Sequence, residues 1–62
     1  MCESNVYLLR KGQEELIMEN VDSLKVDGET ITLKSIFGEE TTVAAGIVEL
    51  RLSAHRILLE PR

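Results

Sequence analysis

A chain of 62 residues is long enough for one small domain, so residues 1–62 are expected to form a single unit. Apolar residues make up 44% of the chain and recur along its length, which argues against an intrinsically disordered chain. Seven Lys and Arg stand against eleven Asp and Glu, and Tyr7 and Phe37 are the two aromatic residues. Such an acidic chain with few base-stacking rings is not expected to bind nucleic acid.

Short runs of strand-like composition follow one another, at 6–9, 14–18, 23–27, 30–33, 41–45, 47–53 and 56–60. Lys11-Gly12, Asp27-Gly28 and Ala54-His55 lie between such runs, and each predicts a tight turn. The segment 19–22 is predicted to be a polar connection between two strands. No segment favours a helix.

Alternation of apolar and polar residues predicts which side chains face the core. Ile31 and Leu33 are expected on one face of their strand, and Val48, Leu50 and Leu52 are expected to point inward from theirs. About six short strands without a helix indicate an all-β fold. The specific expectation is a small SH3-like barrel, because closing a sheet removes its exposed edges.

The sequence shows none of the common catalytic templates. It has no glycine-rich phosphate loop, no paired-cysteine zinc motif and no spacing of Ser, His and acidic residues that indicates a triad. The chain is therefore not expected to be an enzyme. No apolar stretch approaches the roughly 18 residues of a membrane span, and the start does not resemble a secretory signal, so a cytoplasmic location is expected.

Cys2, the single cysteine, is the candidate metal ligand. If Met1 is removed, Cys2 carries a free amine and a thiol that can chelate one metal ion; if Met1 is retained, the thiolate can pair with a deprotonated backbone amide. Thiolate and nitrogen ligands in a square plane suit Ni(II) or Cu(II). The alternative is that Cys2 is a small buried hydrophobic residue, the commoner role of a lone cysteine.

A four-ligand site of this kind requires two chains, because one chain supplies about two ligands. This predicts a two-fold homodimer with the metal on its axis. Dimerisation would also help to stabilise a domain too short for a large core and without an intrachain disulfide. His55 could also bind nickel, but its place in a predicted turn favours a solvated side chain. Glu14-Glu15 and Glu39-Glu40 are expected to be solvated surface.

Several segments resemble the CooT family of small nickel-binding proteins. They are Met1–Tyr7 (MCESNVY), Glu15–Val21 (ELIMENV), Ile36–Glu39 (IFGE) and His55–Glu60 (HRILLE), in an order and spacing that cover nearly the whole chain. The resemblance implies an SH3-like homodimer that binds Ni(II) through Cys2 and assists maturation of carbon monoxide dehydrogenase. The backbone nitrogen of Glu3 is a further candidate ligand, and His55 is not carried over as one.

Two alternatives of another class remain at this stage. The chain could be a small RNA-binding module, because SH3-like barrels include such proteins, or a protein-interaction module in which Cys2 is structural. RNA affinity that falls steeply with salt would indicate the first. A protein partner retained after chelation and after Cys2→Ser would indicate the second.

Overall fold

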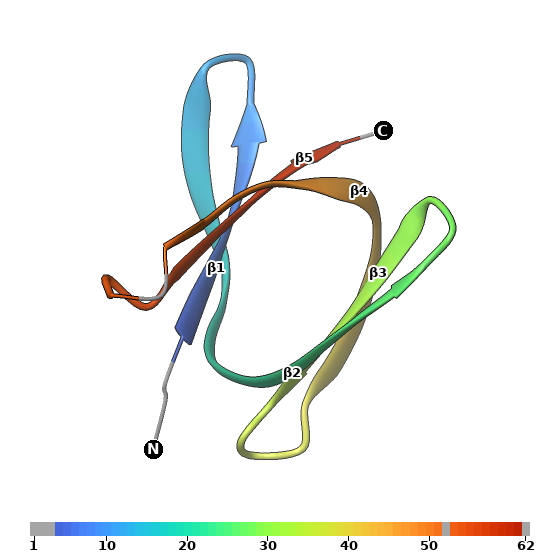
Figure 1. Ribbon diagram of the computed structural model, residues 1–62. Coiled ribbons are helices and arrows are strands. Elements are labelled where there is room, and N and C mark those ends of the chain that lie inside the picture. The colour runs from blue at the N-terminus through green and yellow to red at the C-terminus, as the bar shows by residue number, and fades with distance from the viewer. Residues whose placement is uncertain (1–3, 52, 62) are drawn as a thin grey trace.

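The computed structural model describes residues 4–51 and 53–61 and contains five strands in this part of the chain. They are β1 (Ser4–Arg10), β2 (Gln13–Asp27), β3 (Thr30–Ser35), β4 (Glu40–Arg51) and β5 (Arg56–Pro61). Consecutive strands pair antiparallel, and β5 closes the barrel by pairing in parallel with β1 (Figure 1). This arrangement confirms the predicted all-β, SH3-like barrel. The described residues include no helix that could cross a membrane.

The first predicted hairpin turn forms where expected, and the second forms one residue later than predicted. Lys11 and Gly12 have φ angles of 52° and 76° and connect β1 to β2, as a turn with two positive φ angles requires. The second turn is displaced by one residue, because Asp27 still pairs with Thr30 and the loop consists of Gly28 and Glu29. Gly28 supplies the positive φ of 63° there.

Two expected strand breaks are absent, so the seven strand-like runs of the sequence form five strands rather than the predicted six or so. The segment 19–22 is not a connection but the middle of β2, a 15-residue strand that pairs first with β1 and then with β3. Asn20, at φ 54°, lets the strand bend, and Val21 is buried beside it. β4 likewise continues through Gly46. Long bent strands let a small barrel close with few connections.

The core is built from inward-facing apolar side chains of all five strands. They are Val6, Leu8, Met18, Val21, Ile31, Leu33, Ala45 and Leu59. Ile31 and Leu33 are fully buried, which confirms the face predicted for them.

The predicted inward orientation of the β4 side chains is wrong for two residues. Val48 is 50% exposed and Leu50 is 53% exposed, and Leu52 lies outside the described residues. The register between β4 and β5 shifts between Ile47 and Glu49, so Val48 is an extra residue without a partner on β5. Such a bulge breaks the two-residue period on which the prediction depended.

The turn after β3 depends on Ser35, a buried hydroxyl. Its Oγ accepts hydrogen bonds from the N–H groups of Phe37 and Glu39, both at 3.2 Å. Ser35→Ala would leave two N–H groups without this acceptor, so we expect a loss of about 1–3 kcal/mol in the free energy of unfolding. Urea denaturation should detect this loss, and Ser23→Ala, an exposed control on β2, should change stability by less than about 0.5 kcal/mol.

Candidate functional site

The start of β1 is fixed by hydrogen bonds to two other parts of the barrel, one of which is bonded to a third. The N–H of Asn5 donates to the carbonyl oxygen of His55 at 2.9 Å, and the Oδ1 of Asn5 accepts from the N–H of Asn20 at 3.3 Å. The carbonyl oxygen of Asn20 in turn accepts from the N–H of Ile36 at 2.9 Å. At this end of the barrel, hydrogen bonds therefore link the first described residues to the turn before β5 and to the bend of β2. The bend of β2 is linked in turn to the turn after β3.

The predicted metal ligands Cys2 and Glu3 lie outside the described residues. His55 lies next to the start of β1, in the predicted turn, which is thereby confirmed. It has a φ of 53° and its side chain is exposed. The residue contributes its backbone carbonyl to the anchoring of Asn5, which gives it a structural role.

Within residues 4–51 and 53–61, no three His, Cys, Asp or Glu side chains gather where they could hold a metal ion. Of the acidic residues at 14–15 and 39–40, Glu14 forms an ion pair with Arg56. The guanidinium carbon of Arg56 also lies 4.3 Å from the centre of the Tyr7 ring. Glu14 is thus engaged on the outer surface of the barrel, where a cation from solution would have to compete with Arg56.

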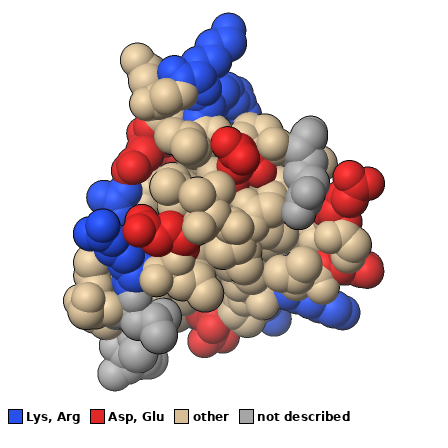
Figure 2. All heavy atoms as spheres, turned by 45° about the horizontal axis from the view of Figure 1, so that its top comes forward, with Lys and Arg blue, Asp and Glu red and all other residues tan. Residues whose placement is uncertain are grey.

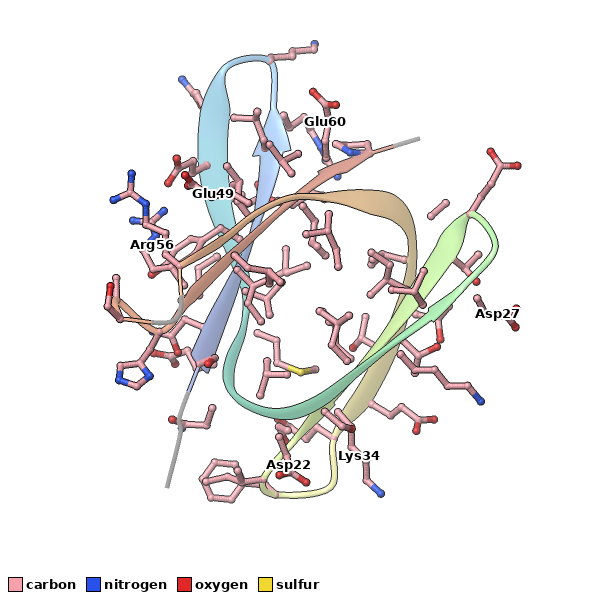
Figure 3. All side chains as sticks on the ribbon, viewed as in Figure 1. Asp22, Asp27, Lys34, Glu49, Arg56 and Glu60 are labelled. Atoms are coloured by element: carbon pink, nitrogen blue, oxygen red, sulfur yellow. The ribbon has the colours of Figure 1, made fainter. Side chains whose placement is uncertain are left out.

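Charged side chains lie on the outside of the barrel, without a continuous basic surface in the views shown. In Figure 3, the labelled charged side chains project away from the barrel interior; they are Asp22, Asp27, Lys34, Glu49, Arg56 and Glu60. On the face shown in Figure 2, Lys and Arg form separate groups with acidic and uncharged side chains between them. On this face, the described residues form no single basic patch of the kind typical of a nucleic-acid interface.

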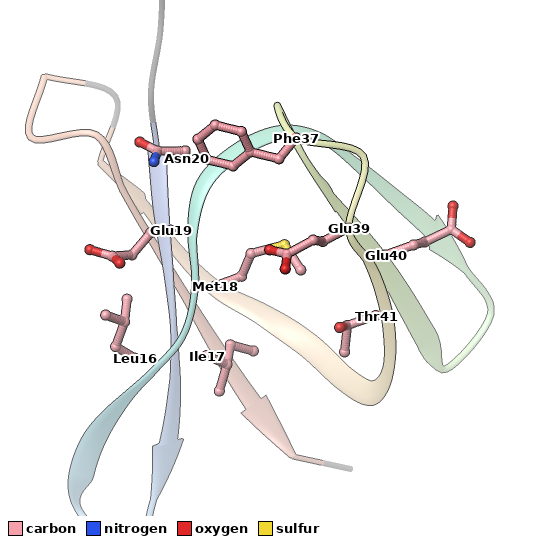
Figure 4. Close-up of a pocket in the computed structure, with 9 residues that line it drawn as sticks. All are labelled: Leu16, Ile17, Met18, Glu19, Asn20, Phe37, Glu39, Glu40 and Thr41. Carbon is pink, nitrogen blue, oxygen red and sulfur yellow. The ribbon is translucent and has the colours of Figure 1, made fainter.

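An open groove of about 510 Å³ lies between the first half of β2 and the start of β4 (Figure 4). Leu16, Ile17, Met18 and Phe37 give it apolar walls, and Glu39 points across it. Sequence reasoning missed this groove, since it predicted a strand at 14–18 and solvated surface at Glu39 without bringing the two together. The available signal was Phe37, one of the two aromatic residues, which lies between the strand-like runs 30–33 and 41–45.

Comparison with known proteins decides the family. The family model described as CooT, CO dehydrogenase accessory protein, matches residues 1–60. The chain belongs to the CooT family. Among solved structures, a crystal structure from Carboxydothermus hydrogenoformans described as a candidate CooT is 39% identical, with a TM-score of 0.91 over 98% of each chain. No curated protein sequence matches the chain.

Membership in CooT confirms the resemblance seen in the sequence and makes this chain a member of a family of CO dehydrogenase accessory proteins. The match begins at residue 1 and therefore includes Cys2 and Glu3. The described residues alone do not contain a set of metal ligands.

Proposed function

We propose that this CooT protein is a cytoplasmic nickel metallochaperone or nickel store that captures Ni(II) through Cys2 at the interface of a homodimer. Two Cys2 thiolates would supply sulfur, and the N-terminal amines or the backbone nitrogens of Cys2 or Glu3 would complete a square plane. Capture releases protons from these groups, and transfer to a client proceeds by ligand exchange. The client suggested by the family description is a carbon monoxide dehydrogenase.

The observation that carries this proposal is the family match through Cys2, joined to the anchored start of β1. Cys2 precedes Ser4 by two residues, and two residues of extended chain span at most about 7 Å. A metal bound by Cys2 would therefore lie near the end of the barrel that Asn5 and Asn20 hold in place. An anchored strand limits the entropy lost when the ligands are brought together.

Apolar side chains near this end support a shared site between two chains. Ile36 is 40% exposed, and Leu50 is 53% exposed. Ile36 is hydrogen-bonded to Asn20, and Leu50 adjoins Arg51, which pairs with Arg56 beside Asn5. Exposed apolar groups beside a proposed two-fold site are suited to burial against a second copy.

Leu50→Asp tests this dimer arrangement. Placing a charge in the interface should weaken self-association by at least about tenfold, because burial of an unpaired carboxylate costs more than 1.4 kcal/mol. Nickel affinity should fall with it, since each chain holds half of the ligands. Sedimentation velocity and nickel titration of the reduced protein measure the two effects.

Val26→Asp is the matched control, because Val26 is 55% exposed and lies at the β2–β3 hairpin. It should leave both self-association and nickel affinity unchanged. A Leu50→Asp protein that remains dimeric and binds nickel like the wild type would show that this apolar surface is not the interface.

A further inference from the structure

The first half of β2 has an unpaired edge. β2 pairs with β1 from Gln13 to Val21, but its pairing with β3 starts only at Val21. Within the described residues, no strand lies beside the segment 13–19 on the side away from β1. An exposed strand edge presents N–H and C=O groups at the spacing of a sheet, so it can accept an added strand.

The groove next to this edge offers apolar contacts. Ile17 and Met18 project into it from β2, and Phe37 lies at its upper end (Figure 4). Phe37 is 74% exposed, the most exposed large apolar side chain of the described part. Exposed aromatic side chains beside a cavity are typical anchors of protein interfaces.

The charge of the groove is acidic and partly uncompensated. Glu39 points across the groove, whereas Glu19 and Glu40 stand at its two rims with carboxylates directed away from it (Figure 4). None of the residues that line the groove is Lys or Arg. Lys34 is the cross-strand neighbour of Glu40, but no described cation forms a salt bridge with Glu19 or Glu39.

We propose that this groove binds an extended, basic segment of a partner protein. The segment would add a strand to the edge 13–19, place an apolar side chain against Phe37, and bring Lys or Arg beside Glu39. Charge complementarity selects a basic polypeptide over nucleic acid, whose phosphates Glu39 would repel. This inference extends the proposed function, in which such a partner is the client that receives nickel.

Nuclear magnetic resonance with a synthetic peptide of alternating Lys and Val tests the proposal on the reduced, metal-free full chain. The amide signals of 14–20 and 37–41 should move most. A peptide with Glu in place of Lys should not bind. Glu39→Lys and Phe37→Ser should each weaken binding at least about tenfold, which corresponds to 1.4 kcal/mol.

Glu29→Lys, which makes the same charge change in the exposed β2–β3 turn, is the control and should bind nearly as well as the wild type. Equal weakening by Glu29→Lys and Glu39→Lys, or binding of the Glu peptide, would overturn the proposal. So would loss of a homodimer in Phe37→Ser, because the groove would then be occupied by a second copy. Binding should persist in Cys2→Ser, so failure of the nickel proposal would leave this result intact.

Discussion

Cys2→Ser is expected to abolish nickel binding while leaving the barrel folded. A serine hydroxyl does not ionise at neutral pH as a thiol does, so the change removes the anionic ligand from each chain. Nickel affinity should fall by more than about 100-fold. This exceeds the usual loss of metal affinity when a residue that only supports a ligand is mutated. Competition titration with a nickel chelator measures the change, and far-ultraviolet circular dichroism checks the fold.

His55→Asn is the matched control for that experiment. His55 is exposed and has a positive φ, a conformation that asparagine also tolerates, so the turn before β5 should persist. The variant keeps the backbone carbonyl that binds Asn5, and its nickel affinity should equal that of the wild type. An equal loss in both variants would make the imidazole a ligand and contradict the proposed ligand set.

Leu33→Ala is expected to remove much of the stability of the barrel. Leu33 is fully buried at the centre of β3, between its partners Leu24 and Thr41. Truncating a buried leucine typically costs about 2–5 kcal/mol. A domain of this size has about 3–9 kcal/mol in total, at 0.05–0.15 kcal/mol per residue, so unfolded chains should become detectable without denaturant.

Urea denaturation at several protein concentrations measures this effect and separates it from dimer dissociation. Val26→Ala, on the adjacent strand of the same hairpin, is the control, since Val26 is 55% exposed. It should cost less than about 1 kcal/mol. Equal losses in Leu33→Ala and Val26→Ala would contradict the assignment of the core.

Local rules were sufficient for the hairpins and for part of the core. Gly12 and Gly28 occupy positive φ because glycine permits it, and this preference is visible in the sequence. Ile31 and Leu33 follow the two-residue period of an uninterrupted strand, and both are buried as predicted. These features depend on neighbours in the chain, which explains why sequence reasoning found them.

The features missed depend on tertiary structure. The polar segment 19–22 continues as a strand because Asn20 bends it and Val21 reaches the core, where β1 and β3 both pair with β2. The exposure of Val48 follows from a bulge opposite β5, which no pattern within β4 reveals. Both errors came from treating a strand as straight and regular.

The candidate site was predicted in part. The sequence placed His55 in a turn, and the structure adds that this turn hydrogen-bonds to the start of β1. Cys2 and Glu3 stay predictions, because they lie outside the described residues. The groove beside Phe37 is formed by segments about 20 residues apart, so it required the folded barrel to be seen.

Native mass spectrometry of the reduced protein, titrated with Ni(II) beside Cys2→Ser, tests the central claim most directly. It reports the removal of Met1, the oligomeric state and the metal stoichiometry in one spectrum. The proposal predicts one nickel ion per two chains in the wild type and none in the variant. Nickel bound to single chains, or bound equally by Cys2→Ser, would contradict a site shared between two Cys2 residues.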